Sequence, residues 1–200
     1  MAKYPLLSNC SIVLLAGGRG QRMGGQDKGW VNWQGQALIE HMQHVVRPLT
    51  DDLIISCNRN HQRYQRLADQ IVSDTNLDFA GPLAGILSAL EVARHPYLLV
   101  LPCDAPRIDQ ALLTQLYQHA GEYPVLLQHK GHWQPLFSLI PCAQLKNLQD
   151  LWDAGERSPK HALLKLNPVV IDCPDHEQRL ANFNDPSVLQ QPLLIKETLC

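Results

Sequence analysis

The sequence lacks the features that define several classes of protein. Its six cysteines are spread along the chain without a Cys-x-x-Cys pair or the spacing of a zinc site, so we expect reduced thiols and a cytoplasmic location. No apolar run approaches the roughly 20 residues that a membrane-spanning helix needs. We therefore expect no membrane segment, no signal peptide and no lipid anchor.

A strong excess of one charge is also missing. The formal net charge is -2, which gives no whole-molecule attraction to nucleic acid or to an anionic membrane, so neither is expected as a partner. The chain has no internal repeat, no low-complexity tract and no linker rich in Pro, Gly or Ser. Its 200 residues suit one domain.

Short apolar runs alternate with longer amphipathic segments. This pattern predicts an α/β fold, a Rossmann-like three-layer sandwich with a mainly parallel central sheet. The expected strands are Ser11–Ala16, Leu53–Cys57, Gln70–Ser73, Tyr97–Pro102, Val125–Gln128, Leu136–Ile140 and Val169–Cys173. The expected helices are Leu38–Val46, Leu83–Arg94, Gln110–Ala120 and Cys142–Ala154. Open sheets of this kind bind ligands beyond the carboxyl ends of their strands, so the segments that follow strands are the candidate site.

The segment after the first strand is rich in glycine and positive charge. Residues 15–28 contain five glycines, two arginines and one lysine. Glycines let the backbone approach a ligand closely, and successive N–H groups then form a concavity for phosphate oxygens. Arg22 can bind a phosphate with two hydrogen bonds, and Lys28 adds a mobile point charge. The segment therefore predicts a phosphate-binding loop.

Two common phosphate-binding motifs do not match this loop. A Walker A motif needs Ser or Thr after Gly-Lys, whereas Lys28 follows Asp27 and precedes Gly29. The dinucleotide fingerprint needs glycine where Met23 stands, which argues against a nicotinamide-dependent oxidoreductase.

The same loop resembles a known family. Leu-Ala-Gly-Gly at 15–18, followed by Arg-Met-Gly-Gly at 22–25 and Asp-Lys-Gly at 27–29, is similar to the molybdenum cofactor guanylyltransferase branch of the nucleotidyltransferases. The resemblance implies that the nucleotide contacts Leu15, Ala16, Gly17 and Gly18. It implies that Arg22 and Lys28 contact the triphosphate and that Gly25 faces the acceptor.

An aspartate ends the apolar strand expected at 97–102. Asp104 lies between Pro102 and Pro106 and is well placed to hold Mg²⁺, which prefers one or two carboxylates together with phosphates and water. The other interpretation, a cap for the following helix, suits Asp109 better. The resemblance implies that Asp104 is the magnesium ligand and contacts the nucleotide.

Two further positions at strand ends are less distinctive. Asp74 follows a short strand, and the residues alone allow a turn aspartate as readily as a ligand-binding one; the resemblance implies a nucleotide contact. Ser56 stands where the family usually has Asn. A hydroxyl can bind a base or ribose, but it cannot present a donor and an acceptor as an amide does. This departure weakens the case for guanine.

The second half of the chain carries weaker signals. Asn182 and Asn184 precede Asp-Pro; amides suit the mixed edge of a pterin, but the pattern also suits a turn. The resemblance implies that both asparagines bind the acceptor. His129 and His132 are expected as surface residues in a turn between strands rather than as a metal site. We expect a nucleotide-binding half at about 10–105, an acceptor-binding half at about 106–190 and a tail at 191–200.

No arrangement of a nucleophile with a base stands out, which suits an acceptor that is already nucleophilic. A phosphomonoester has a second pKa of about 6 and is mostly dianionic at neutral pH. The resemblance implies transfer of GMP from GTP to the phosphate of molybdenum-molybdopterin, with Mg²⁺ as cofactor and with molybdoenzymes or their chaperones as recipients. The alternatives are a cytidylyltransferase, a sugar-phosphate nucleotidyltransferase, and a non-catalytic protein that delivers nucleotide or cofactor.

Overall fold

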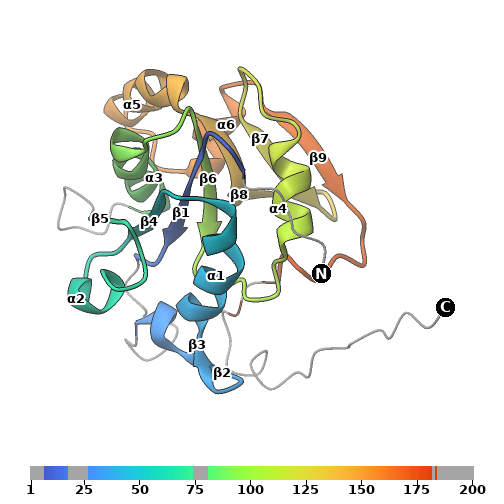
Figure 1. The fold of residues 1–200 in the computed structure, drawn as a ribbon. Coiled ribbons are helices and arrows are strands. Elements are labelled where there is room, and N and C mark those ends of the chain that lie inside the picture. Colours follow the sequence, from blue (N-terminus) through green and yellow to red (C-terminus); the bar gives the residue numbers. More distant parts are fainter. Residues whose placement is uncertain (1–6, 18–26, 74–80, 182, 184–200) are drawn as a thin grey trace.

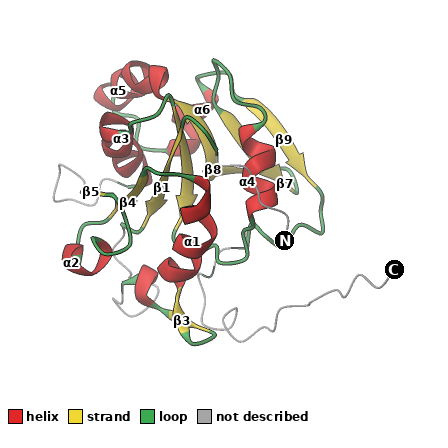
Figure 2. Cartoon of the chain, in the orientation of Figure 1, coloured by secondary structure: helices red, strands yellow, loops and turns green. Residues whose placement is uncertain are grey.

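A seven-stranded sheet with the order β5-β4-β1-β6-β8-β7-β9 runs through the protein (Figures 1 and 2). The computed structural model describes residues 7–17, 27–73, 81–181 and 183. The strands of the sheet are β1 (Cys10–Leu15), β4 (Leu53–Ser56), β5 (Gln70–Val72), β6 (Tyr97–Pro102), β7 (Val125–His129), β8 (His132–Pro141) and β9 (Val169–Cys173). Only β8 is antiparallel to the strands beside it, so within the described residues the sheet is mainly parallel, as the sequence predicts.

Helices cover both faces of the sheet. The α-helices are α1 (Leu38–Val46), α2 (His61–Tyr64), α3 (Pro82–Val92), α4 (Gln110–Tyr117), α5 (Leu145–Asp153) and α6 (Pro159–Leu164). Three short 3-10 helices are η2 (Lys28–Trp30), η3 (Arg47–Leu49) and η4 (Cys142–Gln144), and β2 (Asn32–Trp33) pairs with β3 (Gln36–Ala37) as a separate hairpin. No helix in the described ranges is long and apolar enough to cross a membrane.

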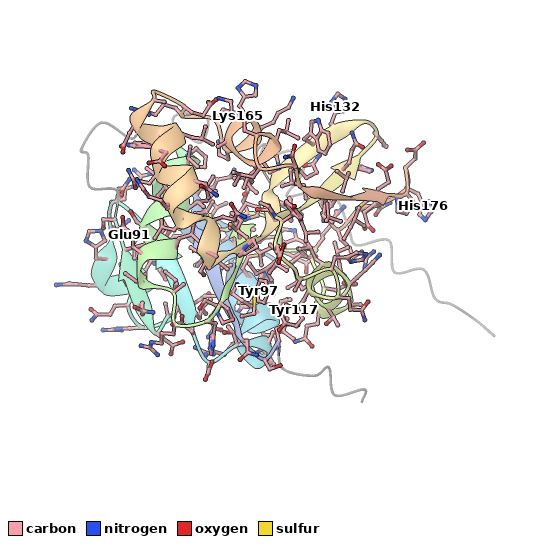
Figure 3. All side chains as sticks on the ribbon, turned by 90° about the horizontal axis from the view of Figure 1, so that it is seen from above. Glu91, Tyr97, Tyr117, His132, Lys165 and His176 are labelled. Carbon is pink, nitrogen blue, oxygen red and sulfur yellow. The ribbon has the colours of Figure 1, made fainter. Side chains whose placement is uncertain are left out.

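The strand pleat divides the core into two layers. Ile12 and Leu14 of β1 join the side chains of α1, α2 and α4 on one face, whereas Val13 and Leu15 join those of α3, α5 and α6 on the other. Figure 1 shows α3 and α5 on one side of the sheet, and α1 and α4 on the other. Figure 3 shows Tyr97 of β6 near Tyr117 of α4, and their ring centroids are 6.2 Å apart. The expected three-layer sandwich is confirmed.

All seven expected strands are present, but one expectation about their ends was wrong. Leu136–Ile140 lies within the longer strand β8, which begins at His132. His132 pairs with His129 across a two-residue turn, so these histidines end two strands instead of lying in the turn. The turn residues Lys130 and Gly131 have φ of 51° and 72°, a combination typical of the tight turns that close hairpins.

The helices differ from the prediction mainly at their ends. The expected helix Cys142–Ala154 starts as the 3-10 turn η4, and α4 stops at Tyr117 rather than Ala120. Asp109 caps α4 as expected, because its Oδ1 accepts a hydrogen bond of 2.8 Å from the amide of Leu112. The short elements α2, α6, β2 and β3 were not predicted.

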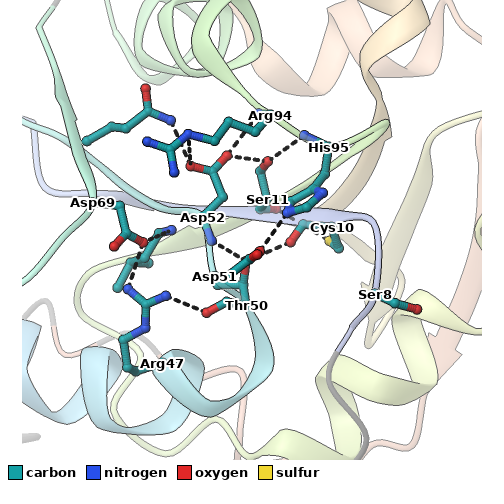
Figure 4. Close-up of polar contacts among 12 residues, drawn as sticks. Ser8, Cys10, Ser11, Arg47, Thr50, Asp51, Asp52, Asp69, Arg94 and His95 are labelled. Carbon is teal, nitrogen blue, oxygen red and sulfur yellow. Dashed lines mark hydrogen bonds and ion pairs between the residues drawn. The ribbon is translucent and has the colours of Figure 1, made fainter.

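Buried polar contacts close the amino edge of the sheet (Figure 4). Asp52 is fully buried and accepts hydrogen bonds from the hydroxyl of Ser11 at 2.6 Å and from the amide of Arg94 at 2.9 Å. Gln70 donates to its other oxygen at 2.7 Å. Because buried carboxylates need such partners, this cluster is a structural link between β1, β4, β5 and the start of β6. The opposite, carboxyl edge is the place where ligands bind in sheets of this type.

Candidate active site

The carboxyl ends of three central strands meet at one level. Leu15 at the end of β1 lies beside Ser56 of β4 and Pro102 of β6. The amide of Ala16 donates to the carbonyl of Ser56 at 2.8 Å, and the amide of Cys103 donates to the carbonyl of Leu15 at 3.2 Å. β1 and β6 are adjacent parallel strands, so the segments that follow them start at the same carboxyl edge of the sheet. The site residues predicted in these two segments therefore lie near each other.

Asp104 and Lys28 meet at this edge. The Nζ atom of Lys28 lies 2.5 Å from Oδ2 of Asp104, and the two side chains are 29% and 5% exposed. Apart from this ion pair, Oδ2 has no hydrogen-bond partner in the described part of the chain. The pair joins residues 76 positions apart in the sequence, counted from 28 to 104, and both were predicted to act on the nucleotide.

Asp104 can serve as a magnesium ligand. Oδ2 of Asp104 is buried and already faces one cation, the Lys28 ammonium, and Mg²⁺ needs only one or two carboxylates when phosphates complete its shell. Within the described residues, no group of three or more His, Cys, Asp or Glu could hold a metal by itself. A single carboxylate at the strand ends fits a metal that arrives with the phosphates of a nucleotide.

Ser56 lies between the sheet and α3. A Cβ atom added to Gly85 of α3 would lie 2.5 Å from Oγ of Ser56 and 3.2 Å from Cδ2 of Leu15. The helix can thus approach the strand ends only because Gly85 has no side chain. A Cβ atom at Gly17 would lie 3.7 Å from Nδ2 of Asn58, so that amide borders the predicted nucleotide loop.

Phe183, at the end of the described chain, contacts the backbone of Asp104. The amide of Phe183 donates to the backbone carbonyl of Asp104 at 2.8 Å. The Phe183 ring is fully buried and packs edge-on against Trp33, with centroids 5.0 Å apart. The guanidinium of Arg107 lies 5.4 Å from the same ring. The segment predicted to bind the acceptor thus reaches the loop that carries Asp104.

The structure brings together Leu15, Ala16, Gly17, Lys28, Ser56 and Asp104. Six other predicted site residues lie outside the described residues, namely Gly18, Arg22, Gly25, Asp74, Asn182 and Asn184. Their predicted contacts with nucleotide or acceptor remain predictions.

Sequence reasoning did not identify the residues that hold Lys28 in place. Asp27 accepts hydrogen bonds from the hydroxyl of Tyr64 and from the side-chain amide of Asn60. The available signal was weak, because α2 is only four residues long and contributes one fully buried side chain. Asn60 has φ of 57°, a conformation that Asn adopts more readily than most residues, but this shows only in the structure.

Solved structures share this fold across most of the chain. Molybdopterin-guanine dinucleotide biosynthesis protein A from Archaeoglobus fulgidus has a TM-score of 0.73 and 24% identity, over 90% of this chain and 94% of that one. The 4-diphosphocytidyl-2C-methyl-D-erythritol synthase from Anaerococcus prevotii has a TM-score of 0.72 and 8% identity, over 92% of this chain and 93% of that one. At these identities the similarity concerns the fold alone.

Sequence relatives are much closer. The family model of the MobA-like NTP transferase domain matches residues 12–172, so fold, site and family model together define a nucleotidyltransferase. Proteins named molybdenum cofactor guanylyltransferase from Pseudomonas aeruginosa and Pseudomonas fluorescens are 58% and 57% identical over 186 residues. These alignments cover 92% of this chain and 94% and 93% of the relatives. This chain therefore belongs to the molybdenum cofactor guanylyltransferase family.

Proposed function

We propose that this protein transfers GMP from GTP to the phosphate of molybdenum-molybdopterin, forming the guanine dinucleotide form of the cofactor and releasing pyrophosphate. The observation that carries the proposal is the Lys28–Asp104 pair at the carboxyl ends of β1 and β6. The pair combines a partly exposed cation for phosphate oxygens with a buried carboxylate for a divalent metal. It occurs in a chain 58% identical to proteins named for this activity.

The chemistry needs little from the protein beyond binding and charge. An oxygen of the acceptor phosphate forms a bond to the α-phosphorus, the bond from that phosphorus to the bridging oxygen breaks, and pyrophosphate leaves with the bond electrons. The dianionic acceptor is the nucleophile, so no general base is required. Lys28 would bind the triphosphate and offset the charge that develops on it, with Arg22 as a second cation.

We propose Mg²⁺ as the cofactor and Asp104 as its protein ligand. The ion would supply further neutralisation of charge on the phosphate oxygens. Lys28 would then exchange its contact with Asp104 for contacts with the triphosphate. Supporting this, Asp104 and Lys28 already share one small region of the site, so the exchange requires only rotation of a flexible lysine side chain.

Ser56 supports a second candidate, a cytidylyltransferase with the same mechanism. The hydroxyl of Ser56 replaces the amide expected in the family, and its atoms lie against α3. An amide matches a guanine edge with both a donor and an acceptor, whereas a hydroxyl does so less completely. The amide of Asn58 borders Gly17 in the same region.

The test is pyrophosphate release with Mg²⁺ and molybdenum-loaded molybdopterin, comparing GTP with CTP. Release with GTP alone is expected. Release with CTP alone would keep the mechanism and overturn the assignment of the base. If neither nucleotide gives release, the proposal fails, and a sugar phosphate should be tried as acceptor before a delivery protein is considered.

The product would pass to molybdoenzymes or to their chaperones. A cytoplasmic site for the reaction is consistent with the five cysteines in the described residues, all of which are free thiols.

A further inference from the structure

Lys28 belongs to a short segment that is held at both ends. Asp27 begins η2 and receives two hydrogen bonds, one from the Tyr64 hydroxyl to Oδ1 at 2.6 Å and one from Asn60 Nδ2 to Oδ2 at 2.7 Å. The carbonyl of Asp27 accepts from the amide of Trp30 at 3.0 Å and closes the turn. We call Asp27, Asn60 and Tyr64 the Asp27 anchor.

The other end of the segment packs on the same tyrosine. The rings of Trp30 and Tyr64 have centroids 5.1 Å apart, and the guanidinium of Arg63 lies 3.8 Å from the Trp30 ring centroid. Tyr64 is fully buried in the core layer of α1 and α4. A single rigid ring therefore contacts the residues on both sides of Lys28 and Gly29.

Gly29 allows this close approach. A Cβ atom at Gly29 would lie 2.4 Å from the Tyr64 hydroxyl oxygen, a distance no side chain could occupy. The hydroxyl is thus enclosed between the backbone of η2 and the carboxylate of Asp27. Burial raises the pKa of Tyr64, and its hydrogen bond to Asp27 raises it further, so the phenol keeps its proton and remains a donor.

The anchor also joins two segments that are distant in the sequence. Asn60 and Tyr64 belong to the stretch that follows β4, whereas Lys28 reaches across to Asp104 after β6. The anchor therefore fixes the backbone of the lysine relative to the carboxylate.

We infer that Tyr64 and Asp27 are positioning residues for Lys28, which they hold at the catalytic edge before substrate binds. The inference rests on the proposed contact of Lys28 with the triphosphate. When the backbone of Lys28 is already fixed, little conformational freedom of the lysine is lost as the nucleotide binds. Displacement of a catalytic group by about 1 Å can lower the rate by up to about a hundredfold. The hydroxyl of Tyr64 is the part of the anchor that can be removed without changing its packing.

The test is a double-mutant cycle between Tyr64→Phe and Lys28→Ala. We expect Tyr64→Phe to lower kcat/KM for the nucleotide about tenfold in the wild-type background and to have no further effect when Lys28 is alanine. Asp27→Asn should show the same dependence on Lys28. Thermal unfolding of each variant would be followed in parallel, because a loss of folded protein lowers activity in both backgrounds.

Tyr117→Phe is the matched control. Its hydroxyl donates to the carbonyl of Ser8, so the variant also removes one tyrosine hydrogen bond, but in α4 and away from the site. It should leave kcat/KM unchanged in both backgrounds. An equal loss for Tyr64→Phe with and without Lys28, or no loss in either, would overturn the inference.

The same cycle can be measured as the Kd for GTP, which needs neither an acceptor nor turnover. If the wild-type protein binds GTP and the effect of Tyr64→Phe depends on Lys28, the positioning inference holds even if no acceptor supports pyrophosphate release. In that case only the proposed reaction fails. Binding that is insensitive to Lys28 would reject the triphosphate contact on which the inference depends.

Discussion

Asp104 is a buried acidic residue whose position in the fold does not explain why the side chain is acidic. The residue is 4% exposed, and apart from its ion pair with Lys28 its Oδ2 atom has no hydrogen bond in the described ranges. Asp52, at the other edge of the sheet, is fully buried and accepts hydrogen bonds from Ser11 and Arg94. A buried carboxylate with few donors lowers stability unless a cation lies nearby. Local rules of this kind are commonly broken at functional sites, and the ammonium of Lys28 is the nearby cation here.

Replacing Asp104 distinguishes a role in the reaction from a role in the stability of the fold. Asp104→Asn keeps the shape of the side chain but removes the charge that would hold Mg²⁺, so we expect pyrophosphate release to fall by at least about a hundredfold. Thermal unfolding should change little, because Lys28 is partly exposed and can turn to solvent. The control is Asp51→Asn, which removes an exposed carboxylate that pairs with His95 at the amino edge. Retained turnover in Asp104→Asn would reject the metal assignment.

At the scale of elements, the contact of α3 with β4 shapes the side of the site where the nucleotide is predicted to bind. The helix begins at Pro82 after Gly81, whose φ of 89° favours glycine, and Gly85 then passes directly over Ser56. Glycine inside a helix costs up to about 1 kcal/mol relative to alanine. Glycine occurs here in spite of that cost because a larger residue would collide with Ser56 and Leu15.

A methyl group at Gly85 should therefore destabilise the protein, although alanine is the better helix former. We expect Gly85→Ala to lower the free energy of unfolding by about 1–2 kcal/mol, since overpacking outweighs the gain in helix propensity. Ser56→Ala in the same chain should restore most of this loss, because it removes the atom that the new methyl group approaches at 2.5 Å. Denaturant unfolding measures both variants.

Gly121→Ala serves as the control for this pair. The nearest atom to a Cβ there is the carbonyl oxygen of His119 at 3.9 Å, so no strain is expected. If Gly85→Ala is as stable as the wild type, Ser56 and Leu15 move aside easily and the close packing does not hold the nucleotide edge in place.

At the scale of the whole molecule, charged contacts hold the end of the described chain against the rest. Arg179 forms hydrogen bonds with Glu177 at 2.5 and 2.8 Å and with Asp109, the cap of α4, at 3.0 and 3.2 Å. This link lies four residues before Phe183, counted from 179, which contacts the backbone of Asp104. The second half of the chain is thus tied to the loop that carries the magnesium candidate.

The link should make stability depend on pH in acid. The hydrogen bond from Arg179 holds the pKa of Glu177 below its ordinary value. A carboxylate with a lowered pKa stabilises the folded state above its ordinary pKa of about 4.3, and this contribution disappears as the pH falls through the lower, folded value. We expect Arg179→Met to lower the free energy of unfolding by about 1 kcal/mol at pH 7, with the difference from wild type shrinking below about pH 4.

Lys146→Met is the matched control for that experiment. Its partner is Asp150 on the exposed face of α5, where both side chains are mostly in solvent and such pairs contribute little. Urea unfolding at a series of pH values would measure all three proteins. A difference between Arg179→Met and wild type that stays constant down to pH 3 would show that packing, rather than the charge of Glu177, is lost.

Local pattern was enough to predict the regular elements, with errors near their ends. The seven strands were predicted from short apolar runs, which are fully buried in β1 and β4 but mostly exposed in β9. The capping function of Asp109 follows from its position before α4. The starts of β8 and α5 were missed because pairing across the Lys130–Gly131 turn and the tighter winding of η4 depend on contacts outside each segment. The short helix α2 was not predicted because four residues are too few to show helical periodicity.

The sequence by itself determined the α/β class, the glycine-rich and basic composition of the segment after β1, and the two residues, Lys28 and Asp104, that form the pair. These follow from residue type and order, which need no partner. Only the tertiary structure decided that the two residues meet at 2.5 Å and that Tyr64 supports Lys28 through Asp27. Such contacts join segments from different strands, and their formation depends on how the sheet order brings the strand ends together.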